Sequence, residues 1–291
     1  MATILVTGKN GQLGRELQEL VPDFPNHRFI FTGREELDIC SSTQIKEFTD
    51  NTSIDYIINC AAYTKVDHAE EEHQAAQKLN QHAVGYLGKI AKEKRIRLIH
   101  ISTDYVFSGK NHQPYSEEDS PCPISQYGKS KWEGEKALTQ SGCEHLIIRT
   151  SWLYSPFRNN FVKTMLQLGQ QKPELNVVFD QIGTPTYAKD LALAILTIVT
   201  NCELNKQDFV CGIYNYSNEG VCSWYDFATE IQEVMQTRCK IHPIESKNYP
   251  TIAPRPHYSV LNKSKIKHIF ELDIPYWKAS LIKCLKRLKE N

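Results

Sequence analysis

A phenol and an amine four positions apart are the pair of side chains in this chain with the clearest chemical potential. Tyr127 and Lys131 stand in the run Tyr-Gly-Lys-Ser-Lys. On a helix, residues at this spacing share one face, so both groups would point to the same side. A phenol beside an ammonium can give a proton to a carbonyl oxygen while hydride reaches the carbon. Taken alone, the spacing is common, and an ordinary surface pair is the competing interpretation.

The ammonium of Lys131 is expected to change the acidity of Tyr127. A free phenol has a pKa of about 10. A positive charge roughly 4 Å away, at an effective dielectric constant near 20, contributes about 4 kcal/mol, which is about three pKa units. We therefore predict that Lys131 lowers the pKa of Tyr127 towards neutrality. Lys131 could also hold the ribose hydroxyls of a nucleotide cofactor.

Two hydroxyl side chains follow the apolar run at residues 98–101. Ser102 and Thr103 come directly after it, at the end of a predicted strand. A hydroxyl in this place could bind the oxygen of a carbonyl substrate and stabilise the developing alkoxide. Thr103 is the stronger candidate and Ser102 the weaker, and the alternative is that both only satisfy main-chain groups of a turn.

A glycine-rich segment follows the first predicted strand and precedes a helix. Gly8, Gly11 and Gly14 stand in Gly-Lys-Asn-Gly-Gln-Leu-Gly, with one more residue between the first two glycines than in the commonest dinucleotide pattern. Gly8 would permit a tight turn, Gly11 would let the main chain approach a pyrophosphate, and Gly14 would let helix and strand close up. The free N–H groups of the helix start attract such an anion. A plain glycine turn and an FAD site are the competing interpretations.

The end of the second predicted strand bears on cofactor choice. An NAD-selective enzyme usually has an acidic residue there, whereas this strand ends in Phe-Thr-Gly-Arg at Arg34. A guanidinium can bind a 2'-phosphate, so we predict NADPH as cofactor, with NADH as a second option because Glu35 and Glu36 follow. The competing interpretation pairs Arg34 with a nearby carboxylate. Asp38 is expected near the adenine, and the small residues that follow the third strand leave room for the nicotinamide ribose.

Short apolar runs alternate with helix-length amphipathic segments along the chain, which is the pattern of βαβ units. Strands are predicted at residues 4–7, 28–31, 56–60, 98–101, 146–149, 177–179 and 212–216. We therefore predict an α/β fold, a Rossmann-type doubly wound parallel sheet with a smaller C-terminal substrate-binding lobe. Residues 1–152 would form the NAD(P)-binding domain. Residues 153–291 would form mainly the lobe, with some segments, such as 212–216, returning to the sheet.

The amino-acid composition argues against several classes of protein. The 291 residues are 41% hydrophobic, and 34 basic residues match 34 acidic ones, so no general field draws in nucleic acid or an anionic membrane. The nine cysteines are scattered and never spaced Cys-x-x-Cys, which argues against a disulfide framework and a zinc site. No signal-type or membrane-spanning run is found. We expect a cytoplasmic protein that binds neither nucleic acid nor membranes, and a C-terminal amphipathic helix that lies on the surface.

Four segments of the chain together resemble the dTDP-4-dehydrorhamnose reductase family, over nearly the whole length. They are Ser-Thr-Asp-Tyr-Val-Phe from Ser102, Tyr-Gly-Lys-Ser-Lys from Tyr127, Arg-Thr-Ser-Trp-Leu-Tyr from Arg149, and Asp-Gln-Ile-Gly-Thr-Pro-Thr from Asp180. Members of that family are extended short-chain reductases. They reduce the 4-keto group of dTDP-4-dehydro-6-deoxy-L-mannose with NADPH or NADH, giving dTDP-L-rhamnose for polysaccharides.

The resemblance implies roles for particular residues. It makes Thr103, Tyr127 and Lys131 a catalytic triad. It places a set of residues at the cofactor, namely Gly11, Gln12, Leu13, Asp38, Ile39, Ala62, Tyr63 and Thr64. It places Asp104 and Trp152 at the sugar nucleotide, and Arg255 could meet the diphosphate. A core aromatic is the alternative for Trp152, and a structural ion pair is the alternative for Arg255. Some members form dimers around Mg²⁺ held by acidic side chains, so a homodimer and Mg²⁺ stay open, and no ligands for the ion are identified.

The residues beside the triad argue against two other activities that related proteins have. Dehydratases of the superfamily carry Thr-Asp-Glu, whereas the third position here is Tyr105, so elimination lacks its base. Epimerase-reductases that resemble GDP-fucose synthase use a cysteine where this chain has Asp104. Reduction remains. The alternatives are a non-catalytic NADP-binding regulatory subunit, like that of methionine adenosyltransferase, and a reductase of another nucleotide sugar.

Overall fold

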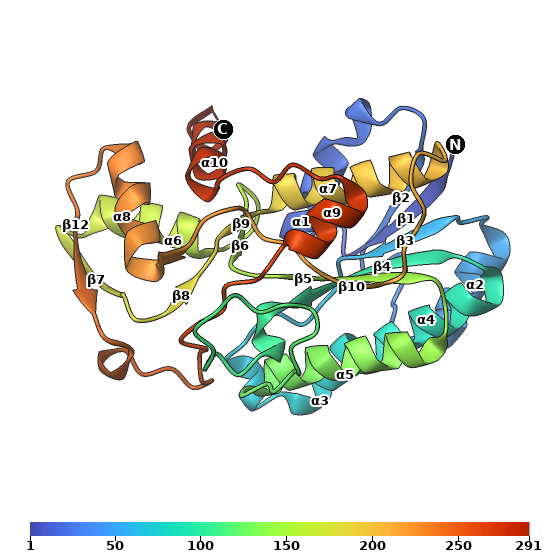
Figure 1. Ribbon diagram of the computed structural model, residues 1–291, viewed down its shortest axis with the longest axis horizontal. Coiled ribbons are helices and arrows are strands. Elements are labelled where there is room, and N and C mark those ends of the chain that lie inside the picture. Colours follow the sequence, from blue (N-terminus) through green and yellow to red (C-terminus); the bar gives the residue numbers. More distant parts are fainter. Residues whose placement is uncertain (291) are drawn as a thin grey trace.

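The computed structural model describes residues 1–290 and is built on one six-stranded parallel sheet. The strands lie in the order β10-β5-β4-β3-β1-β2 (Figure 1). Their bounds are β1 Thr3–Thr7, β2 Arg28–Thr32, β3 Tyr56–Asn59, β4 Arg97–Thr103, β5 His145–Thr150 and β10 Gly212–Asn215. The chain runs outward in one direction from β1 to β2 and in the other from β3, so the order reverses between β1 and β3. Ligands of open α/β sheets bind at such a reversal.

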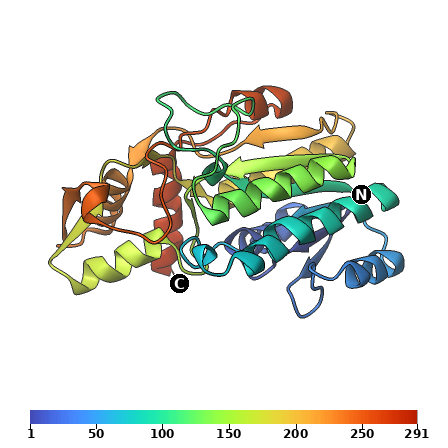
Figure 2. The same cartoon turned by 90° about the horizontal axis from the view of Figure 1, so that it is seen from below.

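Helices cover both faces of the sheet, as Figures 1 and 2 show. On one face lie α1 Gln12–Glu19, α7 Ala188–Glu203 and α9 Ser264–Phe270, and on the other lie α2 Ser42–Asn51, α4 Ala83–Lys94 and α5 Gln126–Ser141. Successive residues of a strand point to opposite faces, so Ile4 and Val6 pack in one core and Leu5 packs in the other. The consecutive apolar residues that predicted doubly covered strands are therefore buried on both sides.

Smaller elements connect or extend these layers. The short helices are η1 Val21–Asp23, η2 His68–Glu70, α3 His73–Gln77, the π-helical turn η3 Lys78–His82, η4 Asp104–Val106 and η5 Ser246–Asn248. The segment from α3 to α4 runs continuously and packs along α5. This arrangement supports the helix that carries Tyr127 and Lys131.

A second layer of structure lies beside the C-terminal edge of the sheet (Figure 1). It contains α6 Phe161–Gln171, α8 Trp224–Met235 and α10 Trp277–Glu290, with the strand pairs β7 Glu174–Val178 and β12 Lys240–Ile244, β8 Ile182–Gly183 and β11 Cys222–Ser223, and β6 Leu153–Tyr154 and β9 Thr186–Tyr187. Its own core includes Phe227, Trp277 and Leu281. The C-terminal helix therefore packs its apolar face within the molecule.

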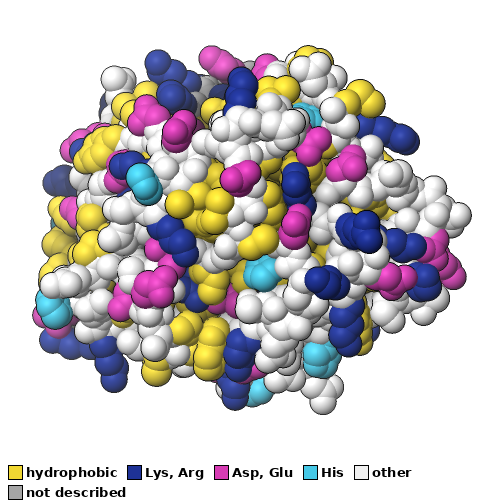
Figure 3. Space-filling view, turned by 45° about the vertical axis from the view of Figure 1, so that its right-hand side comes forward, with side chains coloured by type: hydrophobic (Ala, Val, Ile, Leu, Met, Phe, Trp, Pro, Cys, Tyr) yellow, Lys and Arg dark blue, Asp and Glu magenta, His cyan; other side chains and the backbone are white. Residues whose placement is uncertain are grey.

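The predicted fold class, an α/β doubly wound parallel sheet, is confirmed. From the segment 212–216, which the sequence analysis expected to return to the sheet, residues Gly212–Asn215 form β10, which pairs with β5 at the sheet edge. Within residues 1–290 no helix is both long and apolar enough to cross a bilayer. Acidic and basic side chains are interspersed over the face in Figure 3, in line with the formal net charge of zero.

Candidate active site

The glycine loop forms a cradle at the point where the strand order reverses. Gly8 has a φ of +72°, a conformation that side-chain-bearing residues rarely adopt, and a Cβ there would lie 2.7 Å from the main-chain nitrogen of Ala61. A Cβ on Gly14 would lie 2.5 Å from the carbonyl oxygen of Gly8, so α1 can approach β1 only at a glycine. Gly11 is the N-cap of α1 and offers no side-chain acceptor. The N–H groups of the first turn are left for an anion.

A close approach between two helices brings Tyr127 to the sheet edge. Ser125 caps α5 by accepting a hydrogen bond from the N–H of Gly128 at 3.1 Å. A Cβ on Gly128 would lie 2.2 Å from the carbonyl oxygen of Tyr105, so only glycine lets α5 start against η4. The ring of Tyr105 also packs edge-on against that of Tyr127, with centroids 5.5 Å apart. The start of α5 is therefore held beside Thr103.

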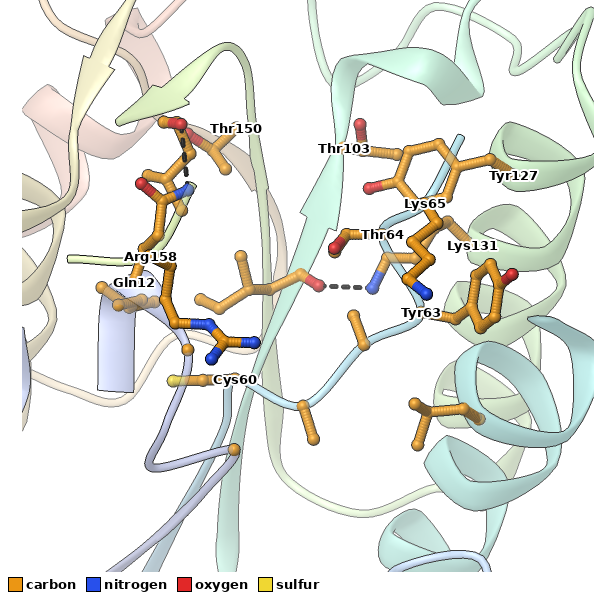
Figure 4. A pocket seen from close by; sticks show the side chains of 18 of the residues that line it. Gln12, Cys60, Tyr63, Thr64, Lys65, Thr103, Tyr127, Lys131, Thr150 and Arg158 are labelled. Carbon is orange, nitrogen blue, oxygen red and sulfur yellow. Dashed lines mark hydrogen bonds between the residues drawn. The ribbon is translucent and has the colours of Figure 1, made fainter. Parts of the chain in front are cut away.

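Thr103, Tyr127 and Lys131 gather on one side of a single large cavity (Figure 4). Tyr127 is 9% exposed and Lys131 is 1% exposed, yet both line this cavity of about 1300 Å³. The Thr103 hydroxyl lies near the Tyr127 phenol and opposes the rise of its pKa. The two residues therefore face one ligand space instead of bulk water.

The predicted effect of Lys131 on the acidity of Tyr127 is wrong for this arrangement. Burial raises the pKa of Tyr127 above its usual value, and the neighbouring groups that act on it are Thr103, Asp104 and Tyr105. The Lys131 amine instead donates a 2.6 Å hydrogen bond to the carbonyl of Ile101. Desolvation penalises the phenolate more than any neighbour stabilises it. Burial likewise lowers the pKa of Lys131, to about 8.

Asp104 is a buried carboxyl beside Thr103. Its Oδ1 accepts a 3.0 Å hydrogen bond from the Thr103 hydroxyl, and nearby Ser259 acts to lower its pKa. Within residues 1–290 its Oδ2 has no hydrogen-bond partner, although the residue is 2% exposed and lines the cavity. Burial raises the pKa of this carboxyl to about 7. An unpaired, cavity-lining oxygen of this kind suits a polar group of a ligand.

Ser102 is engaged by a buried ion pair. Its hydroxyl donates to Glu135, which also accepts two hydrogen bonds from Arg149, from Nε at 3.0 Å and from Nη2 at 2.7 Å. All three side chains are at most 3% exposed. The hydroxyl of Ser102 is thus committed to the packing of β4 against α5, which leaves Thr103 as the hydroxyl of this pair for substrate.

Most residues that the sequence placed at the site line the one cavity. They are Gly8, Gly11, Gln12, Leu13, Arg34, Asp38, Ile39, Ala62, Tyr63, Thr64, Ser102, Thr103, Asp104, Tyr127, Lys131 and Trp152. Gly14 serves the packing of α1, as described above, and Arg255 is not a lining residue. Loops far apart in sequence thus converge on one space, although their individual contacts with ligands remain predictions.

The two arginines predicted to meet phosphates behave differently. The Arg34 side chain is 85% exposed, and its Nε lies 3.9 Å from Asp38 Oδ2, so it is only loosely held at the cavity. Arg255 makes a 2.6 Å ion pair with Asp67, whose other oxygen accepts from the N–H of Ala253. This is the structural ion pair that competed with a diphosphate contact for Arg255. The pairing joins the Pro-rich segment to the loop after β3.

The sequence analysis named Gln12 but missed three other residues that line the cavity, Arg158, Asn160 and Trp224. Gln12 links the glycine loop to the C-terminal part, since its Nε2 donates to the carbonyl of Leu153 and its Oε1 accepts from Asn160 at 2.9 Å. Arg158 has a φ of +57° and lines the cavity (Figure 4). Trp224 stacks on Trp152 with centroids 3.6 Å apart. Asn160 as a helix cap was a local signal, whereas nothing local marks Arg158 or Trp224.

A metal centre is not supported. Among residues 1–290 no group of three or more His, Cys, Asp or Glu side chains could hold an ion, and the nine cysteines, all within this range, are free. Mg²⁺, which the sequence analysis left open, therefore has no ligand set in the described part of the chain.

Comparisons with known proteins agree with this geometry. A family model described as RmlD substrate binding domain matches residues 1–290. The chain is similar to the dTDP-4-dehydrorhamnose reductase of Aggregatibacter actinomycetemcomitans, with 39% identity over 97% of each chain. It is also similar to that of Escherichia coli K12, with 38% identity over 98% of this chain and 97% of the other.

Solved structures of like sequence superimpose closely on this chain. The dTDP-4-dehydrorhamnose reductase of Clostridium acetobutylicum has a TM-score of 0.92 and 39% identity, covering 99% of both chains. The enzyme of that name from Bacillus anthracis, solved in complex with NADP, also has a TM-score of 0.92, with 35% identity over 98% of this chain and 99% of the other. Nearly the whole chain is thus matched in both sequence and fold.

Proposed function

The chain belongs to the family of the RmlD substrate binding domain, and we propose that it reduces the 4-keto group of dTDP-4-dehydro-6-deoxy-L-mannose with NADPH, giving dTDP-L-rhamnose. One observation carries this proposal. The buried hydroxyls of Thr103 and Tyr127 meet in the same cavity as the glycine cradle. A cofactor seated on that cradle and a carbonyl held by those hydroxyls would share one enclosed space.

The residues of the cradle fit a dinucleotide. A Cβ at Gly8 or Gly14 would clash with the main chain of the loop and of Ala61, so only glycine lets the loop close tightly beside the start of α1, which presents free N–H groups. When bound, a reduced nicotinamide supplies the hydride. Arg34 would hold a 2'-phosphate, while NADH stays the second option because the guanidinium is loosely placed. The B. anthracis relative was solved in complex with NADP, and this supports NADPH as the cofactor that we propose here.

The hydroxyl groups of the chain would handle the substrate oxygen. On substrate binding the Thr103 hydroxyl would turn its hydrogen from Asp104 to the carbonyl oxygen, and the Tyr127 phenol would donate to the same oxygen and hold the proton that it needs when it becomes an alcohol. A raised pKa keeps Tyr127 in its proton-bearing form before the reaction. Asp104 and Trp152 would bind the sugar nucleotide, and most of residues 153–291 would serve the substrate. The free cysteines favour a reducing cytosol as the place of the reaction.

The test is the disappearance of reduced nicotinamide when the 4-keto sugar nucleotide is added to the full chain. We expect turnover for the natural protein and a fall in kcat of about 10²-fold or more for Tyr127→Phe, with the Kd for NADPH changed less than about twofold. Thr103→Ser should retain more activity than Thr103→Val, because serine keeps the hydroxyl. Cofactor binding without turnover on a panel of 4-keto nucleotide sugars would instead favour the regulatory-subunit alternative.

A further inference from the structure

A row of three buried polar side chains crosses neighbouring strands beneath the cavity. Thr7 of β1 pairs in register with Asn59 of β3, which pairs in register with His100 of β4. Register partners point to the same face of a sheet, here the face that α5 covers. The row ends at Lys131 of α5, and all four side chains are at most 1% exposed. Buried groups of this kind must satisfy one another, so the direction of each hydrogen bond can be deduced.

The first link fixes the orientation of the Asn59 amide. The N–H of Ala61 lies 3.2 Å from Asn59 Oδ1, and the Thr7 hydroxyl donates to the same oxygen at 2.7 Å. A main-chain N–H can only donate, so the atom that faces it must be the amide oxygen. The amide nitrogen therefore faces His100, with Nδ2 lying 3.0 Å from Nδ1. Because an amide nitrogen also only donates, Nδ1 of His100 is an acceptor and carries no proton.

The second link follows from the neutrality of the imidazole. Burial, with Lys131 nearby, holds the pKa of His100 well below its usual value. A neutral imidazole whose Nδ1 is bare carries its proton on Nε2. That nitrogen lies 3.3 Å from Nζ of Lys131. An N–H and an amine in this position form a hydrogen bond only when the amine offers its lone pair, which an ammonium lacks.

We propose that His100 is a positioning residue that donates from Nε2 to Nζ of Lys131 and so favours the uncharged form of that lysine. All hydrogen bonds of the row can then form at the same time, from the Ala61 N–H to Asn59, from Asn59 to His100 and from His100 to Lys131. The neutral amine of Lys131 still has a hydrogen to donate to the carbonyl of Ile101. An ammonium at Lys131 would break one bond of the row. Lys131 thus loses its proton at a lower pH than an ordinary lysine does. This inference rests on the proposed function, since it assigns a state to a residue of that site.

Other charges around the pair act in known directions. Burial lowers the pKa of Lys131, as the row does, and the Glu135 carboxylate on the same helix opposes both. His145 on β5 lowers the pKa of His100. Asp104 and Tyr105 on η4 act on Tyr127, the other titratable group on this face of α5. A change at Asn59, on the strand next to that of His100, leaves these groups in place and reaches Lys131 through the row.

The tautomer of His100 is measurable without any turnover. The full chain, labelled with ¹⁵N in its ten histidines, would be compared by NMR with His100→Gln to assign the His100 signals. We expect a neutral ring protonated at Nε2 near neutral pH. A ring protonated at Nδ1, or an imidazolium, would overturn the proposal. Because no substrate is needed, this result stands even if the proposed reductase activity fails.

A near-isosteric change at Asn59 tests the consequence for Lys131. In Asn59→Asp, one carboxylate oxygen still accepts from Ala61 while the other accepts from the ring, so the His100 proton moves to Nδ1 and Nε2 can accept from an ammonium. We expect the limb of the pH profile of kcat/KM that reports Lys131 to move up by about one pH unit. Thr7→Val removes one donor to Asn59 Oδ1, but the Ala61 N–H still orients the amide. The limb of the pH profile should therefore stay at the pH of the natural protein in this variant.

The outcomes separate a positioning role from a merely structural one. An Asn59→Asp profile lowered equally at every pH, with its limb unmoved, would contradict the proposal. Equal shifts in Asn59→Asp and Thr7→Val would contradict it too. If Asn59→Asp does not fold, the tautomer measured on the natural protein decides. If the natural protein shows no turnover, the proposed function fails while the tautomer still tests His100.

Discussion

The indole rings of Trp152 and Trp224 stack with their centroids 3.6 Å apart and their planes 10° from parallel, which joins the loop after β5 to α8 at the cavity wall. Trp152 adopts a φ of +47°, a costly conformation for a bulky residue, so tertiary packing holds it there. Phe161 lies against Trp224, with centroids 4.5 Å apart. The three rings form one aromatic wall that reaches from the sheet edge to the C-terminal part.

Loss of that wall is expected to weaken substrate binding more than chemistry. An aromatic pair contributes about 1 kcal/mol beyond its buried area, so Trp224→Ala should raise KM for the sugar nucleotide about fivefold with a smaller change in kcat. Initial rates at saturating NADPH measure this. Tyr225→Ala, at the next position of α8 and away from the cavity lining, is the matched control. Equal KM values for the two variants would show that the wall does not contact substrate.

Arg34 is predicted to select NADPH over NADH. Its side chain is 85% exposed and makes only a 3.9 Å contact with Asp38, and surface pairs of this kind contribute little to stability. Arg34→Ala should therefore leave the melting temperature unchanged while raising KM for NADPH about tenfold and leaving KM for NADH near its original value. Arg15→Ala, at an exposed arginine of α1 outside the cavity, controls for general charge. If the natural protein strongly prefers NADH, Arg34 does not select NADPH.

Asp104 should make stability depend on pH. Burial raises its pKa to about 7, against about 4 in an unfolded chain. Between these values the folded protein holds a proton that the unfolded chain has released, so the free energy of unfolding falls as pH rises. The stabilisation is full below about pH 4 and is lost as pH passes about 7.

Asp104→Asn cannot titrate and should escape this loss. Its melting temperature relative to the natural protein should rise by about 3 °C or more between about pH 5 and about pH 8. Thermal unfolding in buffers matched for ionic strength measures the difference. Asp23→Asn, at an exposed carboxylate, is the control and should show no such trend. A constant difference for Asp104→Asn at both pH values would mean that Asp104 is ionised when buried.

The buried ion pair of Glu135 and Arg149 is expected to stabilise the fold only when both side chains are present. Glu135→Gln leaves an uncompensated guanidinium at a 1%-exposed site and should lower the free energy of unfolding by about 3–5 kcal/mol. The double variant Glu135→Gln with Arg149→Met should lose less than the sum of the single variants. Urea unfolding of all four proteins gives the coupling energy. Additive losses would show that the two side chains do not stabilise each other.

Local spacing was enough to predict much of this protein. The glycine loop, the alternating strands and the Tyr127–Lys131 spacing depend on residues close in sequence, and the parallel α/β sheet and the family are confirmed. The polar row was not predictable, because Thr7, Asn59 and His100 belong to three separate strands and only the register aligns them. The same holds for Trp224, which reaches the cavity from a distant helix.

The sequence by itself determined which groups could do chemistry and which elements would carry them, because helix and strand periods place side chains on faces without knowledge of the rest of the chain. The tertiary structure alone decided the charge state of those groups. Tyr127 was expected to be acidified by Lys131, yet burial raises its pKa and Lys131 turns to Ile101 and His100. Desolvation and hydrogen-bond direction depend on everything packed around a side chain, and spacing along the chain does not contain that information.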